Sequence, residues 1–158
     1  MIKISVIAVG KIKEKPFTEA IEEYKKRLGA FCELDITEIK PCALPEAPSV
    51  SQIASALKTE ASRISEKIPK GAAVFPLCVE GKSLSSEAFA EKIGYLKNEG
   101  RNICFIIGGS HGLDSEIKKE GFKLSFSAMT FPHRLFRVML LEQIYRAFTI
   151  VSGKKYHK

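Results

Sequence analysis

The sequence is poor in the residues that build metal sites and disulfide frameworks. It has four cysteines and three histidines, and no two cysteines stand in a CxxC pair. They are Cys32, Cys42, Cys78 and Cys104, with His111, His133 and His157. The histidines keep no ligand spacing with the cysteines, so we expect no zinc site or other metal site. We predict reduced cysteines that are buried or half-buried.

The sequence also lacks a membrane span, an internal repeat, a low-complexity tract and a domain linker. No apolar run approaches the roughly 18 residues that a membrane-crossing helix needs. The opening MIKISVIAVGK is too short and too alternating for a signal peptide and is typical of a first strand. These absences predict a soluble cytoplasmic protein with one domain over residues 1–158.

Basic residues exceed acidic ones. Lysine and arginine number 25 against 18 aspartates and glutamates, which gives a formal charge of +7 and an isoelectric point near 9.2. Clustered cations bind the phosphates of nucleic acids, but a solvated basic surface has the same composition. Charge therefore leaves a polyanionic partner and a merely soluble surface both open.

Strand patterns and helix patterns alternate along the whole chain. Strand-like stretches cover residues 3–10, 32–40, 72–81, 102–107 and 122–127. Helical patterns cover residues 16–28, 53–68, 86–96, 114–120 and 132–151. This order is typical of an α/β fold with a mostly parallel sheet flanked by helices. Pro76 lies within the third strand-like stretch and puts a central place for that strand in question.

The carboxyl ends of the predicted strands are the expected ligand site, as in other open α/β sheets. These ends are residues 10–11, 77–81, 108–112 and 126–131. Residues 108–112 read GGSHG, directly after a buried strand. Such a stretch is either a tight strand-to-helix turn or a loop that presents backbone groups to a small molecule. Neither a P-loop nor a dinucleotide fingerprint fits, because Pro76 and Ile107 stand where those motifs need glycine.

The last predicted helix, residues 132–151, is apolar on every side. A helix that is apolar all round is buried all round, and a small single-sheet domain has only a second copy to cover its outer side. We therefore predict a homodimer with this helix in the interface. Glu142 and Arg146 are four residues apart in the favourable order, which predicts an ion pair.

Two histidines flank this helix. His133 stands at its entrance, where it either satisfies a local hydrogen bond or serves as a base or substrate contact. His157 lies in the tail, residues 153–158, which is either a frayed end or an RNA contact. The RNA reading is favoured by the tail's content of an aromatic ring, a titratable ring and three lysines.

Several stretches resemble the RlmH family of SPOUT-class methyltransferases, which methylate N3 of a pseudouridine in 23S ribosomal RNA. They are FIIGGSHGL, LSFSAMTFPHRLFRVMLLEQIYRAF and the terminal YHK, with VIAVGKIKEK and LCVEGKSLSSEAFA earlier in the chain. The resemblance implies an α/β knot with a C-terminal trefoil and S-adenosylmethionine as cofactor. It also implies 23S ribosomal RNA within the assembled ribosome as partner. The implied homodimer shares its active site, with the tail of one subunit meeting the cofactor pocket of the other.

Carried over by position, the resemblance assigns residues to the cofactor and to catalysis. The implied cofactor contacts are Leu77, Gly108, Phe126, Ser127, Ala128, Met129, Thr130 and Phe131. The implied catalytic set is His133, Arg137, Arg146, Tyr156 and His157. A neutral imidazole suits removal of the N3 proton, which leaves His133 and His157 both open as the base. The two arginines suit negative charge on the flanking carbonyls or on phosphates.

Two other functions stay open on the sequence. One is a SPOUT methyltransferase that acts on tRNA, and the other is a non-catalytic ribosome- or RNA-binding protein. The charge and the tail fit a binding protein equally well, but a binding protein does not explain a glycine loop together with the apolar run 126–131. The chain has no room for an extra RNA-binding domain, which favours a small target surface or an assembled particle.

Overall fold

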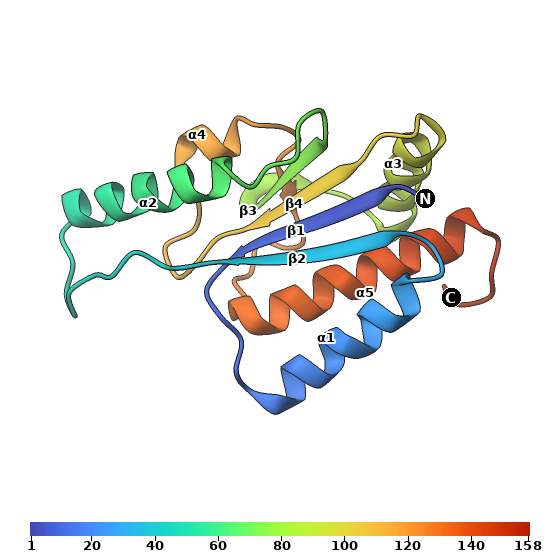
Figure 1. The fold of residues 1–158 in the computed structure, drawn as a ribbon, viewed down its shortest axis with the longest axis horizontal. Coiled ribbons are helices and arrows are strands. Elements are labelled where there is room, and N and C mark those ends of the chain that lie inside the picture. The colour runs from blue at the N-terminus through green and yellow to red at the C-terminus, as the bar shows by residue number, and fades with distance from the viewer.

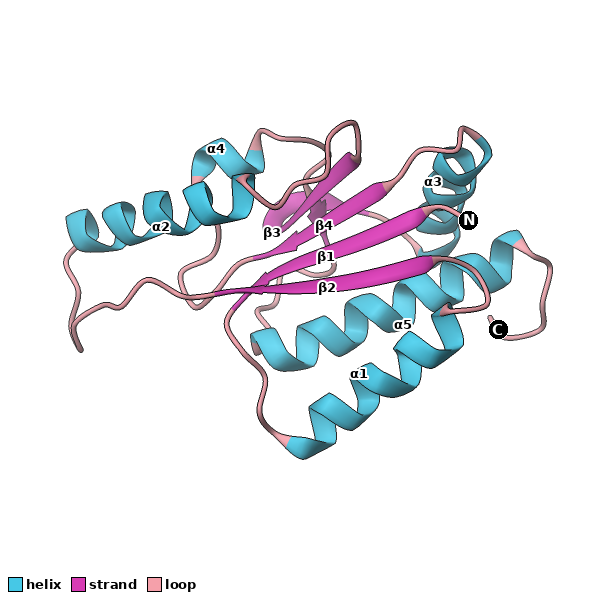
Figure 2. Cartoon of the chain, in the orientation of Figure 1, coloured by secondary structure: helices cyan, strands magenta, loops and turns pink.

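The computed structural model describes all residues, 1–158, as a parallel sheet with helices on both faces (Figure 1 and Figure 2). The strands are β1 (Lys3–Val9), β2 (Glu33–Ile39), β3 (Ala73–Ser83), β4 (Ile103–Ile107) and β5 (Leu124–Ser125). The helices are α1 (Lys15–Leu28), α2 (Val50–Ser65), α3 (Ser86–Asn98), α4 (Ser115–Lys118) and α5 (His133–Val151). All neighbouring strands are parallel, in the order β2-β1-β4-β3-β5. The predicted α/β class with a parallel sheet is confirmed.

Two predicted boundaries were wrong. The strand predicted over 122–127 is reduced to β5, because residues 126–131 leave the sheet as a loop towards α5. The helix predicted over 53–68 begins at Val50 and ends at Ser65. It begins earlier because Ser49 and Gln52 form a reciprocal capping box, each side chain accepting the other's backbone N–H.

Pro76 lies inside β3, which the sequence had put in question. The neighbouring Ala73 N–H donates to Asn102 on the β4 side, whereas the Val74 carbonyl accepts from Phe122 on the opposite side. Residues two apart in a strand point their backbone groups to the same side, so the nitrogen of Pro76 points away from β4, as the Val74 carbonyl does. On that side, β5 first pairs with β3 at Leu77. Its missing N–H therefore removes no hydrogen bond from the β3–β4 ladder.

Alternate side chains of the central strands point to opposite faces of the sheet and belong to two separate apolar clusters. In β4, Ile103, Phe105 and Ile107 join the layer under α1, α3 and α5, while Cys104 and Ile106 join the layer under α2 and α4. The first layer holds 24 buried residues and the second 11, so α5 lies on the larger core. Every residue of β4 is buried, as its continuous apolar run predicted.

The chain itself covers much of α5. Figure 1 shows α1 beside α5 on one face of the sheet, and α3 packs along α5 as well. Phe31 adds contacts to the rings of Tyr145 and Phe148, at centroid distances of 6.0 and 5.5 Å. The statement that only a second copy could cover this helix was therefore wrong, and the homodimer stays a prediction. No helix is both long enough and apolar enough to cross a bilayer.

Four free cysteines lie where the sequence placed them. Cys32 and Cys104 are buried, and Cys42 and Cys78 are half-buried. Burial raises the pKa of Cys32 and of Cys104 to about 12. These two thiols are therefore neutral and unreactive, as structural cysteines are.

β3 bends around β5. Leu124 pairs with Leu77 in the first half of β3 and with Lys82 in the second half, where the Lys82 N–H donates to the Lys123 carbonyl at 2.9 Å. Gly81 sits at the close approach, since a Cβ there would lie 2.8 Å from the backbone of Lys123 and Leu124. The short strand is thus held on both sides by one strand. The trefoil knot that the resemblance implies stays a prediction.

We predict that Gly81→Ala lowers the free energy of unfolding by roughly 1–3 kcal/mol, because the new methyl group overlaps fixed backbone. Chemical denaturation measures the change. Gly29→Ala is the matched control, since Gly29 has an ordinary helical backbone, with a φ of −57°. Its effect should stay within about 1 kcal/mol. Equal effects of the two substitutions would contradict a specific contact at Gly81.

Candidate functional site

The carboxyl ends of β3, β4 and β5 surround a cavity of about 770 Å³, here called the strand-end cavity. Its walls are residues 77–80, 107–113, 124–127 and 129–134, with Lys118 and Phe136. Seven of the eight predicted cofactor residues line it. Ala128 is exposed and does not line the cavity.

The GGSHG stretch makes a tight turn and also forms a wall of this cavity. A Cβ at Gly108 would lie 2.4 Å from the Gly112 carbonyl oxygen, and Gly112 has a φ of +80°. The Gly112 N–H closes the turn by donating to the Gly109 carbonyl at 3.1 Å. Glycine is therefore required at both ends of the turn. The tight turn predicted as one of two alternatives is confirmed, and its binding of a small molecule stays a prediction.

The loop from Phe126 to Phe131 lines the cavity at every residue except Ala128. The Ser125 hydroxyl donates to the Ser127 carbonyl at 3.1 Å, and the Ser127 hydroxyl accepts the Met129 N–H at 3.0 Å. No other backbone N–H of residues 127–131 donates to an atom of the chain. A loop with unpaired amides at a cavity wall is ready to bind a polar ligand.

His133 begins α5 and lines the same cavity. Its ring packs on Gly10, where an added Cβ would lie 3.4 Å from Cε1. Nδ1 is buried without a hydrogen-bond partner, while Nε2 is accessible and also makes no hydrogen bond within the chain. Burial lowers the pKa of His133, and the charges of Arg137 and Arg134 lower it further. The imidazole is therefore neutral at pH 7 with one nitrogen free to accept a proton.

Arg137 is buried behind His133 and does not line the cavity. Its Nη1 donates to Glu38 Oε2 at 2.7 Å and its Nη2 donates to the Gly10 carbonyl at 3.0 Å. Burial acts to raise the pKa of Glu38, but hydrogen bonds from Arg137 and from the Ile12 N–H outweigh it and lower the pKa. Both terminal nitrogens of Arg137 are therefore bonded within the chain, and its predicted part in catalysis stays a prediction.

The other three predicted catalytic residues meet at the far end of α5. The Tyr156 hydroxyl donates to Glu142 at 3.2 Å, and the Arg146 guanidinium lies over the Tyr156 ring. Arg146 also pairs with Glu142 at 2.6 Å, which confirms the predicted ion pair. His157 contacts Arg146 through Nδ1 and Glu87 through Nε2, at 3.1 and 2.6 Å. Since arginine only donates, Nδ1 accepts and Nε2–H donates, so both imidazole nitrogens are engaged.

One chain does not bring the two halves of the predicted catalytic set together. His133 and Arg146 stand thirteen residues apart on one helix. At a rise of 1.5 Å per residue they are separated by about 20 Å along the helix axis. In this structure the tail packs on its own chain, where Tyr156 contacts Glu142 and His157 contacts Arg146 and Glu87.

A family model for predicted SPOUT methyltransferases matches residues 2–157 of this chain. The chain belongs to the SPOUT methyltransferase family. A parallel sheet with a ligand-sized cavity at its carboxyl edge is therefore the scaffold of a methyltransferase.

Two relatives of this methyltransferase are similar over nearly their whole length. The chain is 49% identical over 157 residues to the putative ribosomal RNA large subunit methyltransferase H of Methanococcus maripaludis, covering 98% of this chain and 99% of that protein. It is 48% identical to the ribosomal RNA large subunit methyltransferase H of Clostridium kluyveri, with the same coverage. A solved structure titled "Structural insights into the 2-OH methylation of C/U34 on tRNA" has a TM-score of 0.53. It covers 94% of this chain and 92% of that chain at 15% identity, and shows the fold alone.

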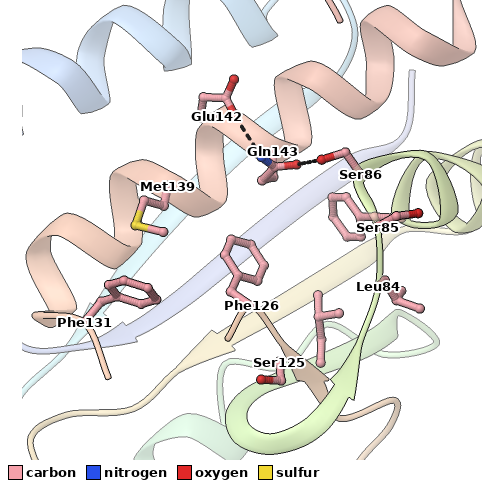
Figure 3. A pocket seen from close by; sticks show the side chains of 11 residues that line it. Leu84, Ser85, Ser86, Ser125, Phe126, Phe131, Met139, Glu142 and Gln143 are labelled. Carbon is pink, nitrogen blue, oxygen red and sulfur yellow. Dashed lines mark hydrogen bonds between the residues drawn. The ribbon is translucent and has the colours of Figure 1, made fainter. Parts of the chain in front are cut away.

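The methyltransferase has a second hollow of about 290 Å³ between α3 and α5, shown in Figure 3 and here called the α3–α5 pocket. Phe126 and Phe131 line both this pocket and the strand-end cavity. On its α5 side, the Gln143 side chain accepts from the Ser86 hydroxyl at 2.8 Å and donates to Glu142 at 3.1 Å. The loop after β5 is therefore a thin wall with open space on both sides.

Sequence reasoning missed several charged residues of the site. Glu80 and Lys118 form an ion pair at the rim of the strand-end cavity. Glu38 anchors Arg137 from the end of β2, where it belongs to an alternating strand. Glu60 is only 8% exposed. Its place between Leu57 and Ile64, on the apolar stripe of α2, could have marked it as buried.

We predict that Arg137→Met lowers the free energy of unfolding by roughly 1.5–3 kcal/mol, because Glu38 and the Gly10 carbonyl lose a charged donor. Arg134→Met on the same helix is the control. Arg134 pairs with Glu14 at the surface, and its loss should cost less than about 1 kcal/mol.

The decrease in the free energy of unfolding caused by Arg137→Met should also depend on pH. The folded-state pKa of Glu38 lies below its ordinary value of 4.5, so its contribution is complete above pH 4.5 and disappears as the pH falls through the folded value. The difference between wild type and Arg137→Met in denaturation experiments should therefore shrink below pH 4.5. A difference that stays constant down to pH 3 would contradict the Glu38 pairing.

Proposed function

We propose that the protein methylates N3 of a pseudouridine in large-subunit ribosomal RNA, with S-adenosylmethionine as methyl donor. The observation that carries the proposal is a cavity with unpaired loop amides beside the free nitrogen of a neutral histidine. The names of the two relatives, both ribosomal RNA large subunit methyltransferases, support the class of substrate. The N3 position and the assembled ribosome follow the family resemblance. This substrate places the enzyme in the cytoplasm.

The residues of the strand-end cavity fit S-adenosylmethionine in their chemistry. Leu77, Phe126 and Phe131 offer apolar surface for an adenine ring, and the loop amides of residues 127–131 offer donors to its polar edge. Gly108 allows the GGSHG turn to close against Gly112 at the wall of the cavity. When bound, this cofactor supplies an electrophilic methyl group on a sulfonium.

His133 is the proton acceptor in this proposal. The ring N3 of a uracil-type base is weakly acidic, and its proton must leave as the new bond forms. His133 Nε2 is free, whereas both nitrogens of His157 are bonded within the chain. Arg137 fixes the first turn of α5 to Gly10 and thereby holds the imidazole in place.

We propose a homodimer in which the tail of one protomer completes the cavity of the other. The separation of His133 from Arg146, Tyr156 and His157 supports this arrangement, as do Leu135 and Val151, which leave 38% and 37% of their surface exposed on α5. The tail would bring a ring and cations to RNA, in keeping with the net charge of +7. Arg146 would then face phosphate or a developing carbonyl charge.

The experiment that tests the function is methyl incorporation from labelled S-adenosylmethionine into intact ribosomes that lack the modification. Mass spectrometry of the digested RNA identifies the nucleoside. We expect label on N3 of a pseudouridine of the large subunit. Label on tRNA only, or no label from a protein shown to bind the cofactor, would overturn the proposed substrate.

We predict that His133→Gln lowers turnover by roughly 10²–10⁴-fold, the usual contribution of a general base. Binding of S-adenosylhomocysteine, measured by calorimetry, should change little. Because the folded pKa of His133 lies below its ordinary value of 6.5, wild-type turnover should fall as the pH is lowered, with its midpoint below pH 6.5. A variant that keeps the wild-type pH profile would exclude His133 as the base.

We predict that His157→Ala spares cofactor binding and lowers methylation. Mixing inactive His133→Gln and His157→Ala dimers should then restore about a quarter of wild-type turnover, because half of the dimers are mixed and each has one intact shared site. If each site belongs to one chain, mixing restores nothing. Unchanged turnover of His157→Ala alone would remove His157 from the site.

A further inference from the structure

A third hollow lies on the opposite side of His133 from the loop after β5. This α2 pocket, of about 230 Å³, is enclosed by α2, the loop after β2 and the GGSHG turn. Its apolar walls are Leu44, Ile53, Ala56 and Leu57. Drug-sized ligands occupy roughly 300–1,000 Å³, so this pocket suits a single small ring.

The α2 pocket and the strand-end cavity share a wall. His133, Gly109, Ser110 and His111 line both of them. A ring seated in the α2 pocket would therefore lie against the group that we propose as the proton acceptor, next to the cavity that suits the methyl donor. A methyl acceptor has to occupy such a place, within reach of both.

Glu60 supplies the one carboxylate of the α2 pocket, and half of it is unsatisfied. Only 8% of Glu60 is exposed. Its Oε2 accepts the Cys42 N–H at 2.8 Å, while Oε1 accepts no hydrogen bond from the chain yet remains accessible. Glu60 takes part in none of the ion pairs of the protein. The nearby cation Arg63 is turned away and donates to the Lys40 carbonyl.

Glu60 Oε1 is thus an open acceptor on an otherwise buried side chain at the wall of a pocket, and it suits a ligand that brings an N–H. The ionised carboxylate only accepts hydrogen bonds. A small flat ring that carries an N–H donor on one edge fits both the size of the pocket and this acceptor. Uridine in RNA is joined to the sugar through N1 and has no hydrogen there. Pseudouridine is joined through C5 and keeps its N1–H.

We propose that the α2 pocket binds the target pseudouracil ring and that Glu60 Oε1 accepts its N1–H. This inference rests on the proposed function and adds the group that distinguishes pseudouridine from uridine. N1 and N3 flank the same carbonyl, so a ring held at N1 by Glu60 turns its N3 edge to the shared wall and His133. Uridine in the same place would leave Glu60 without its donor, and such a mismatch is strongly disfavoured.

Nucleoside binding tests the pocket without any methyl transfer. Pseudouridine and uridine are titrated separately into the protein saturated with S-adenosylhomocysteine, and methyl resonances of Leu44, Ile53 and Leu57 are followed by NMR. We expect pseudouridine to shift these resonances at concentrations roughly tenfold lower than uridine. In Glu60→Gln this preference should disappear, while Glu66→Gln, an exposed site just beyond the same helix, should retain it. Equal response to both nucleosides in wild type, or an unchanged preference in Glu60→Gln, overturns the proposal.

A second variant guards against a merely structural role of Glu60. Ala56→Met fills the pocket and leaves the carboxylate untouched. It should abolish the pseudouridine shifts and lower ribosome methylation, with cofactor affinity unchanged by calorimetry. Wild-type methylation by both Ala56→Met and Glu60→Gln would overturn the pocket and leave the proposed function standing. Selective pseudouridine binding without ribosome methylation would instead support the pocket and reject the proposed ribosomal substrate.

Discussion

The Arg137 guanidinium is the contact on which the geometry of the site depends. It joins three segments that are far apart in sequence, namely the end of β1 at Gly10, the end of β2 at Glu38 and the first turn of α5. A guanidinium holds its donors in a fixed plane, so its two bonds set the direction as well as the distance of the helix entrance. His133, the loop before it and two hollows on either side of it take their places from that anchor.

The site combines a rigid wall with unsatisfied polar groups. Free loop amides, the Nε2 of His133 and the Oε1 of Glu60 all face open space, although most polar groups near a core are paired. The tail shows the opposite pattern, because Tyr156, His157 and Arg146 saturate one another and Glu142. In a single chain the polar groups of the tail are therefore paired, whereas several polar groups around the strand-end cavity have no partner within the chain.

The fold class followed from the sequence because alternating patterns of strand and helix are local. The extent of β5 did not follow, since the apolar run 122–127 gives no sign that β3 wraps around only two of its residues. The resemblance placed Arg137 in the catalytic set, but its partner Glu38 lies 99 residues away and only the tertiary structure joins them. Seven of the residues that line the strand-end cavity were named through the family resemblance. Glu60 was missed because only the apolar residues of its helix were considered, although it lies on the same stripe as Leu57 and Ile64.

The pairing of β3 with both sides of β5 affects the local unfolding of the sheet. An ordinary edge strand peels away at low free energy and exposes its amides to solvent exchange. β5 is the shortest strand and an edge strand by position, yet β3 contacts it from both sides. It cannot separate unless the bend at Gly81 opens too, which ties the loop that follows β5 to the most persistent part of the sheet. The wall of the strand-end cavity is therefore protected from local unfolding on the side where loops usually fray first.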